Sequence, residues 1–177
     1  MAAAPQIRTF RFEPAGNFPN NPRLPVAVYP QVAGMDAKRG GPESLARLFE
    51  ATWPKHGWEA EWRWGVYEFP HYHSTAHEVL GVYRGRATLR LGDSAGVTLD
   101  VAAGDLLVLP AGTAHQNLGA SADFHVVGGY PKGQSADLLR GGDGERAAAE
   151  ARIARVPLPD TDPFFGPRGP LATAWGF

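Results

Sequence analysis

Through the middle of the chain, hydrophobic and polar residues alternate with a period of two, which is typical of β-strands with one buried face. The first such run covers residues 58–67, and its apolar positions share one face: Trp58, Ala60, Trp62, Trp64 and Val66. They alternate with Glu59, Glu61, Arg63 and Tyr67. The pattern predicts one half-buried strand.

Short strands of the same kind are predicted after it, over residues 78–84, 86–91, 96–101, 104–109 and 123–130. Glycine-rich turns separate several of them, for example at Gly92-Asp93 and Gly104-Asp105. Short strands at this spacing favour an antiparallel barrel or sandwich. Since no internal repeat is visible, we expect a single barrel.

Helical spacing of apolar residues predicts a helix over residues 43–53, with Pro42 tolerated in its first turn and Pro54 ending it. It is the only helix predicted in the front half. A second helix is predicted on the surface, over residues 145–155.

The two ends of the chain are predicted to be extended. Strands are expected over residues 7–13 and 26–30, on either side of an arm at residues 16–25 that is rich in proline and asparagine. The tail at residues 156–177 is rich in proline and glycine but also in aromatic residues, unlike a disordered tail. We expect it to lie across the barrel or at a subunit contact.

Composition narrows the possible functions. The 177 residues fit one domain, and 17 basic against 18 acidic residues leave no basic surface for nucleic acid. No apolar run approaches the roughly 20 residues of a membrane helix, and the N-terminus does not resemble a signal peptide. We therefore expect a cytoplasmic protein without nucleic-acid or membrane partners. Since the chain has no cysteine, any metal ligands must be nitrogen and oxygen atoms.

Two short segments contain most of the candidate chemistry. In HYHSTAHE, His71 and His73 leave an extended chain on the same face, and Glu78 can offer a carboxylate to the same ion. In GDLLVLPAGTAH, a turn at Pro110 and Gly112 can return His115 toward the barrel interior. We found no phosphate-binding glycine loop and no nucleophilic serine motif.

These segments resemble the two motifs of the cupin superfamily. The first runs from Gly65 through the ligand residues of HYHSTAHE to Gly85, and the second from Gly104 to His115. Asn117 lies two residues after His115 rather than the usual four, a departure at a position that is not a ligand. Over nearly the whole chain, segments such as FPNNPRLPV, GGYPKGQ and DPFFGPRGPL look like the YjlB-like branch of small single-domain cupins.

The resemblance implies an all-β fold, a single jelly-roll (double-stranded β-helix) barrel with one or two peripheral helices and extended arms. Residues 58–131 would form the barrel core, residues 1–57 an N-terminal arm packed on it, and residues 132–177 a C-terminal helix and aromatic tail. It also implies one divalent transition metal (Fe, Mn, Ni, Cu or Zn) held by His71, His73, Glu78 and His115. A homodimer is expected, as is common among cupins.

Other residues offer weaker signals. His77, Glu68 and Gln116 are candidates for proton transfer or substrate orientation, although His77 on a strand would face away from Glu78. His56 and His125 are interpreted as an exposed and a wall histidine. The aromatic residues before the first motif are interpreted as core, the alternative being that one or two line the pocket: Trp62, Trp64, Tyr67, Phe69 and Tyr72.

Two functional hypotheses remain open. The first is a metal-dependent enzyme acting on a small organic substrate, with dioxygenase chemistry slightly ahead of isomerase or lyase chemistry. The second is a small-molecule or metal-binding module without turnover. A purely structural role would leave four aligned ligands unexplained.

Overall fold

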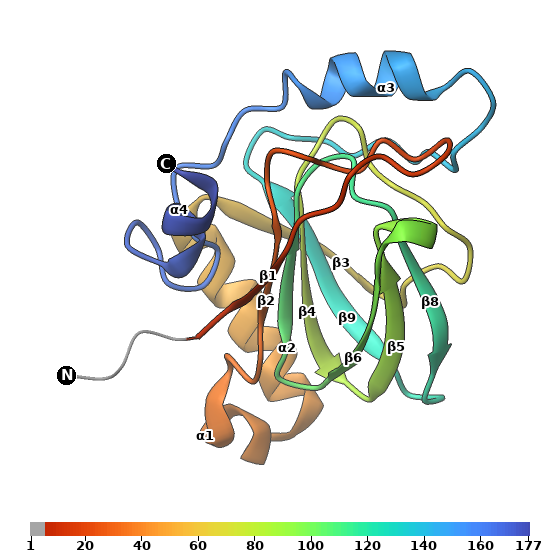
Figure 1. Ribbon diagram of the computed structural model, residues 1–177. Coiled ribbons are helices and arrows are strands. Elements are labelled where there is room, and N and C mark those ends of the chain that lie inside the picture. The colour runs from red at the N-terminus through yellow and green to blue at the C-terminus, as the bar shows by residue number, and fades with distance from the viewer. Residues whose placement is uncertain (1–5) are drawn as a thin grey trace.

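The computed structural model describes residues 6–177 and shows two antiparallel sheets that face each other. The larger sheet has the order β1 (Arg8–Phe10), β2 (Val26–Tyr29), β7 (Leu106–Leu109), β4 (Glu78–Arg84), β9 (His125–Pro131), β3 (Trp58–Trp64). The smaller sheet has the order β6 (Val97–Ala102), β5 (Arg86–Leu91), β8 (His115–Ala120). Figure 1 shows β5, β6 and β8 beside the larger sheet. The predicted all-β jelly-roll barrel is confirmed.

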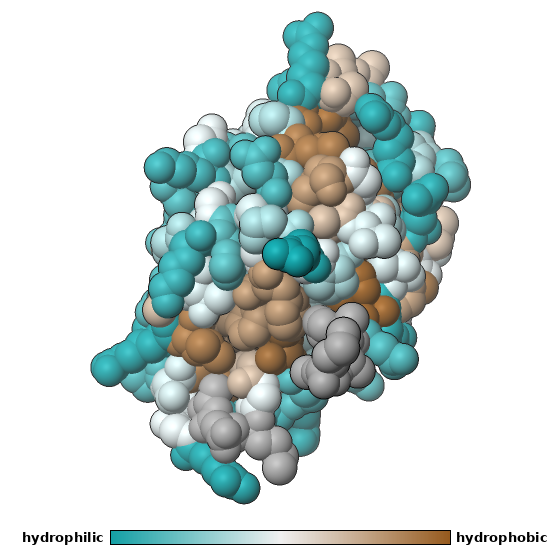
Figure 2. Space-filling model, turned by 90° about the vertical axis from the view of Figure 1, so that its left-hand side faces the viewer, coloured by the Kyte–Doolittle hydropathy of each residue, from teal (hydrophilic) through white to brown (hydrophobic). Residues whose placement is uncertain are grey.

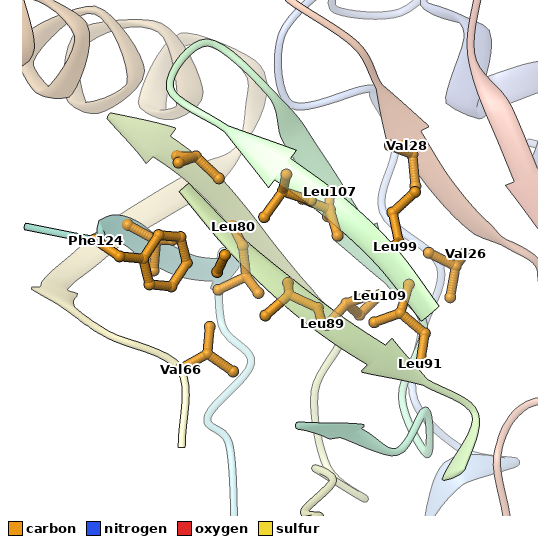
Figure 3. Close-up of a cluster of buried hydrophobic side chains, with 14 of the residues drawn as sticks. Val26, Val28, Val66, Leu80, Leu89, Leu91, Leu99, Leu107, Leu109 and Phe124 are labelled. Carbon is orange, nitrogen blue, oxygen red and sulfur yellow. The ribbon is translucent and has the colours of Figure 1, made fainter. Parts of the chain in front are cut away.

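The barrel interior is filled by aliphatic side chains from both sheets. Alternate positions of β5 and β6 point inward, so Leu89, Leu91 and Leu99 meet Leu80 and Leu107 of the larger sheet (Figure 3). All five are buried. This core explains the clean two-residue alternation of β5 and β6, whose other face is in contact with solvent.

The outer face of the larger sheet is covered by a second core. Helix α2 (Gly41–Thr52), the 3₁₀ turn η1 (Trp53–His56) and the C-terminal helix α4 (Pro170–Trp175) pack there. In Figure 1, α2 and α4 lie on the side of the sheet away from β5. Because β2 and β7 are covered on both faces, they read as continuous apolar runs, VAVY and LLVL.

The aromatic tail is attached to this outer face through Asp162. Its buried carboxylate accepts hydrogen bonds from the hydroxyl of Tyr29 on β2 (2.7 Å) and from the backbone N–H of Leu171 (3.1 Å). The indole of Trp175 donates to the carbonyl of Pro25 (2.8 Å). The tail is thus part of the folded domain and lies across the barrel, one of the two expected positions.

Several elements differ from those that the sequence predicted. Strand β8 and the short helices α1 (Gly34–Arg39) and α4 were not predicted. Helix α2 ends at Thr52, just before Pro54 as predicted, and the chain continues into η1 with Pro54 in its first turn. Strands β1 and β2 are hydrogen-bonded into the larger sheet, so the predicted boundary at residue 58 divides that sheet.

The single face predicted for residues 58–67 is wrong. A β-bulge between Ala60 and Trp62 changes the alternation within β3. Trp58 and Ala60 therefore pack in the outer core, whereas Trp62 turns to the barrel interior. Trp64 is 66% exposed.

The predicted surface helix is present as α3 (Arg146–Ile153), and the arm before β2 crosses the barrel end. Asn20 and Asn21 of this arm are buried and hold the turn of the second motif: Asn20 accepts from the N–H of Ala114, and Asn21 donates to the carbonyl of Ala111. Within residues 6–177, no helix combines the length and the apolar character needed to cross a membrane.

Candidate metal centre

The two histidine segments meet at one end of the barrel, where a backbone bridge joins His71 and His115. The N–H of His71 donates to the carbonyl of His115 (3.1 Å), and the N–H of His115 donates to the carbonyl of His71 (2.9 Å). Glu78 is the first residue of β4 and pairs with Leu109, just before the turn that leads to His115. The bridge and this pairing bring residues distant in sequence to one place.

The three imidazoles and the carboxylate form one compact group. Metal-binding atoms of His71, His73 and His115 lie within 4.8 Å of one another. The carboxylate of Glu78 lies beside them, with Oε1 3.4 Å from Nε2 of His73 and Oε2 3.1 Å from Nε2 of His115. All four side chains are buried or nearly so.

Backbone carbonyls fix the orientation of each imidazole. Nδ1 of His71 donates to the carbonyl of Phe69 (3.0 Å), and Nδ1 of His115 donates to that of Thr113 (2.9 Å). Nδ1 of His73 donates to the carbonyl of Asp137. Since a carbonyl only accepts, Nδ1 carries the proton in each ring and Nε2 is left as the lone-pair donor. Such outer hydrogen bonds are typical of metal-ligating histidines.

The electrostatics of the group also favour a cation. Burial and the neighbouring His115 lower the pKa of His71 to about 3, so this ring stays neutral. Burial opposes protonation of His73, but Glu78 outweighs it and raises the pKa of His73 to about 9. Burial would raise the pKa of Glu78, yet His73 and His115 hold it below its ordinary value. A buried carboxylate among imidazoles thus requires a positive partner, either a proton or a metal ion.

A cavity of about 490 Å³ opens onto this group. Its non-ligand lining comes from β3 and the segment after it, from β4 and β9, and from residues 136–138: Trp62, Arg63, Trp64, Gly65, Val66, Tyr67, Leu80, Tyr130, Ala136, Asp137 and Leu138. The size suits a small organic molecule.

Residues 136–138 form one wall of the cavity, and the segment around them is tied to the first motif. Tyr72 and Leu139 exchange two backbone hydrogen bonds of 3.0 Å. The carboxylate of Asp137 accepts from the backbone N–H of Ser74 (2.6 Å) and from its hydroxyl. This wall also supplies the carbonyl that orients His73, a role that the sequence did not reveal.

The structure does not bring the three predicted proton-transfer residues to the cavity. His77 faces the opposite side of β4, where its ring packs against Trp175 with centroids 4.8 Å apart. Its Nδ1 accepts from the N–H of Ala111 (2.9 Å), and burial lowers its pKa to about 4. Glu68 is exposed, and Gln116 donates to the carbonyl of Glu68 (2.9 Å).

The aromatic residues before the first motif divide between core and cavity. Trp62, Trp64 and Tyr67 line the cavity. The core interpretation is wrong for Trp64 and Tyr67, which are exposed, whereas Trp62 lines the cavity and also packs against the barrel core. Tyr72 is fully buried, as interpreted. Tyr130 was missed. Its only signal in the sequence is the preceding pair of glycines, which gives no indication of a cavity.

The donor set fits a divalent transition metal. Three neutral Nε2 atoms and one carboxylate suit iron, manganese, nickel, copper or zinc, and the absence of thiolates removes the softest choices. The residues that would hold the ion are His71, His73, His115 and Glu78.

Comparison with known proteins finds a relative of nearly the same length. The Bacillus subtilis (strain 168) protein named "Uncharacterized protein YjlB" is 36% identical over 170 residues, which cover 96% of this chain and 97% of the relative. No protein-family model matches the chain.

Among solved structures, a DUF861 family protein from Thermotoga maritima is 22% identical, with a TM-score of 0.32, over 46% of this chain and 85% of its own. A cupin 2 domain-containing protein from Halorhodospira halophila is 13% identical, with a TM-score of 0.32, over 89% of this chain and 86% of its own.

Proposed function

The chain belongs to the YjlB-like branch of the cupins, and on this premise we propose that it is a metal-dependent enzyme acting on a small organic substrate. The observation that carries the proposal is the shared orientation of three imidazoles, each with Nδ1 bonded to a carbonyl and Nε2 available to one ion. A purely structural role would not require these lone pairs to converge beside a buried carboxylate.

In this proposal the chain supplies the ligands and the cavity. A bound ion would act as a Lewis acid able to polarise a carbonyl, activate water or activate dioxygen. Four protein ligands leave one or two coordination positions of a five- or six-coordinate ion for substrate, and open positions distinguish catalytic from structural sites. Dioxygenase chemistry is our first hypothesis, ahead of isomerase or lyase chemistry.

The first test is elemental analysis of protein purified without a polyhistidine tag. We expect about one equivalent of a transition metal per chain, or its uptake on titration. The His115→Gln variant should bind metal more weakly by at least the roughly 10- to 100-fold that loss of an outer partner costs. The matched variant His125→Gln, remote from the cavity, should bind as the wild type does. No metal uptake by the wild type would refute the proposal.

The second test concerns turnover. The metal-loaded protein is screened for oxygen consumption with keto acids, diketones and phenolic acids, and for isomerised or cleaved products without oxygen. Oxygen consumption by the wild type that is absent in the His115→Gln variant would support a dioxygenase.

One observation favours the alternative of a non-catalytic binding module. None of His77, Glu68 and Gln116 lines the cavity, so those proton-transfer candidates are absent from it. Persistent inactivity of the loaded protein, together with a metabolite recovered on purification, would favour that alternative.

We also propose that the protein is a homodimer. Apolar residues gather on the face around α4 (Figure 2), where Phe165 is 38% and Leu158 is 43% exposed. Burial of such a patch between two copies would remove it from water. Light scattering at micromolar concentration should give twice the mass of the chain, and a monomer would contradict the prediction.

A further inference from the structure

The charges around the cavity nearly cancel, apart from that of Glu78. Arg63 is the only arginine or lysine among the lining residues, and its guanidinium is bound to Glu50 (2.6 and 2.8 Å) and to Glu43 (2.8 and 3.2 Å). That guanidinium also lies over the ring of Tyr83, which belongs to the outer core. No lining cation is therefore free to receive an anionic group of a substrate.

The remaining lining carboxylate is also satisfied. Asp137 is bonded to Ser74, and its Oδ2 lies 3.8 Å from Nε of Arg152. With all three imidazoles neutral, as metal binding requires, the site has one negative charge, from Glu78, and a divalent ion would make its net charge about plus one. A substrate with a single negative charge would neutralise it, whereas a second negative charge would be buried without a partner.

The walls of the cavity are apolar and aromatic. Leu80 and Val66 are buried at 2% and 9% exposure, while Trp64 and Leu138 are exposed at 66% and 46%. Exposed apolar side chains at a cavity can cover a flat, apolar ligand. The walls offer few partners for a polyhydroxylated molecule.

Tyr130 supplies one hydrogen-bond donor within these walls. The indole N–H of Trp62 donates to the hydroxyl oxygen of Tyr130 (3.0 Å), and no acceptor for the phenolic proton is found among residues 6–177. Gly128 permits this arrangement, because a Cβ there would meet the Trp62 ring at 2.0 Å. The rings of Tyr130 and His73 have centroids 6.2 Å apart. The free O–H can thus serve an oxygen atom bound beside the imidazoles.

We propose that the cavity selects a monoanionic oxygen chelator with an apolar body, of the class of enolised diketones and flat hydroxy-ketones. Tyr130 is its specificity-determining residue and donates a hydrogen bond to one ligand oxygen. Dicarboxylates and phosphate esters are disfavoured by their second charge. The inference rests on the proposed function, because the ion supplies the positive charge that the chelator neutralises.

The test measures the binding of two bidentate oxygen ligands to metal-loaded protein at pH 8. Tropolone has one negative charge and an apolar ring, whereas malonate has two negative charges. Each dissociation constant is divided by that of the same ligand for the free ion in buffer. We expect this ratio to favour tropolone by at least about tenfold. Equal ratios, or a preference for malonate, would overturn the inference.

Variants then test the donor. Tyr130→Phe should weaken tropolone binding about tenfold, the loss expected for one hydrogen bond to a charged acceptor, and should change malonate binding little. Tyr83→Phe, a matched change in the outer core, should bind both ligands as the wild type does. An undiminished affinity for tropolone in Tyr130→Phe would remove Tyr130 from this role.

Metal content, measured before each titration, separates the two proposals. A wild-type protein that takes up no ion contradicts the proposed function and, with it, this inference. An ion-loaded protein that does not prefer tropolone leaves the metal site standing and contradicts the inference alone.

Discussion

The imidazoles of His71, His73 and His115 differ in their affinity for protons although they share one kind of backbone partner. His71 has a pKa of about 3, lowered first by burial, whereas Glu78 outweighs burial at His73 and raises its pKa to about 9. In the metal-free protein, a proton on His73 therefore balances the carboxylate. A metal ion must displace that proton, so metal binding and proton binding compete at one ring.

This competition predicts an unusual pH dependence. The raised pKa of His73 contributes stability fully below pH 6.5, and the contribution is lost as the pH rises toward 9. The lowered pKa values of His71 and His77 act oppositely, since their contribution is present above pH 6.5 and lost as the pH falls toward 3 or 4. The lowered pKa of Glu78 adds to the stability that is lost as the pH falls. The Tm of the metal-free protein should be highest near pH 6.5.

Metal affinity should instead increase between pH 6.5 and 9, by up to about tenfold per pH unit, because one proton is released for each ion bound. Calorimetric titration in two buffers of different ionisation enthalpy measures both the affinity and the proton release. His125→Gln should show the same dependence. An affinity that does not change above pH 6.5 would mean that His73 is already neutral in the metal-free site.

At the scale of elements, the close packing of α2 on β4 explains why residue 81 is a glycine. A Cβ at Gly81 would lie 2.6 Å from Cδ2 of Phe49, whose ring is fully buried against the strand. Gly81→Ala should destabilise the fold by about 1–3 kcal/mol, the usual cost of overpacking. Urea denaturation measures it, and Gly119→Ala, with no atom within 4 Å of its Cβ position, should change stability by less than about 0.5 kcal/mol. Equal effects of the two changes would show that Phe49 moves away freely.

Strands with clear alternation or a turn at their ends were the easiest to predict. Strands β4 and β5 have the predicted bounds, because the alternation of β5 and the turn at Gly85 define their ends. Strand β8 was missed since HQNLGA shows little alternation and its pairing depends on β5. The β3 bulge was also missed, because an extra residue leaves no local signature when aromatic residues occupy both faces.

The site shows a similar division between local and distant information. His71 and His73 are two residues apart, so their common face could be predicted from one segment. Tyr130 and the wall at residues 136–138 could not, because their place in the cavity depends on how β9 pairs with β3. His77 was predicted to face away from Glu78, and it does. The structure adds its hydrogen-bond partner, the backbone N–H of Ala111.

At the scale of the molecule, Asp162 joins the tail to the sheet. Its two carboxylate oxygens accept four hydrogen bonds, from Tyr29, Phe164, Phe165 and Leu171. Asp162→Asn would place an N–H₂ opposite two of these donors and should cost about 1–3 kcal/mol. Limited proteolysis should then cut the tail faster, whereas the exposed Asp160→Asn should behave as the wild type. An unchanged cleavage rate in Asp162→Asn would show that the outer core alone holds the tail.

The backbone bridge between His71 and His115 makes their amide exchange sensitive to a bound ion. Because the amides of both ligands are hydrogen-bonded to each other's carbonyls, these amides exchange with deuterium only when the bridge opens. An ion held by both side chains would oppose that opening. Hydrogen-exchange mass spectrometry should therefore show slower exchange in the peptides around residues 71 and 115 when metal is added, with no change in the edge strand β1. The exchange rate of two amides would then report how strongly the bound ion stabilises the closed bridge.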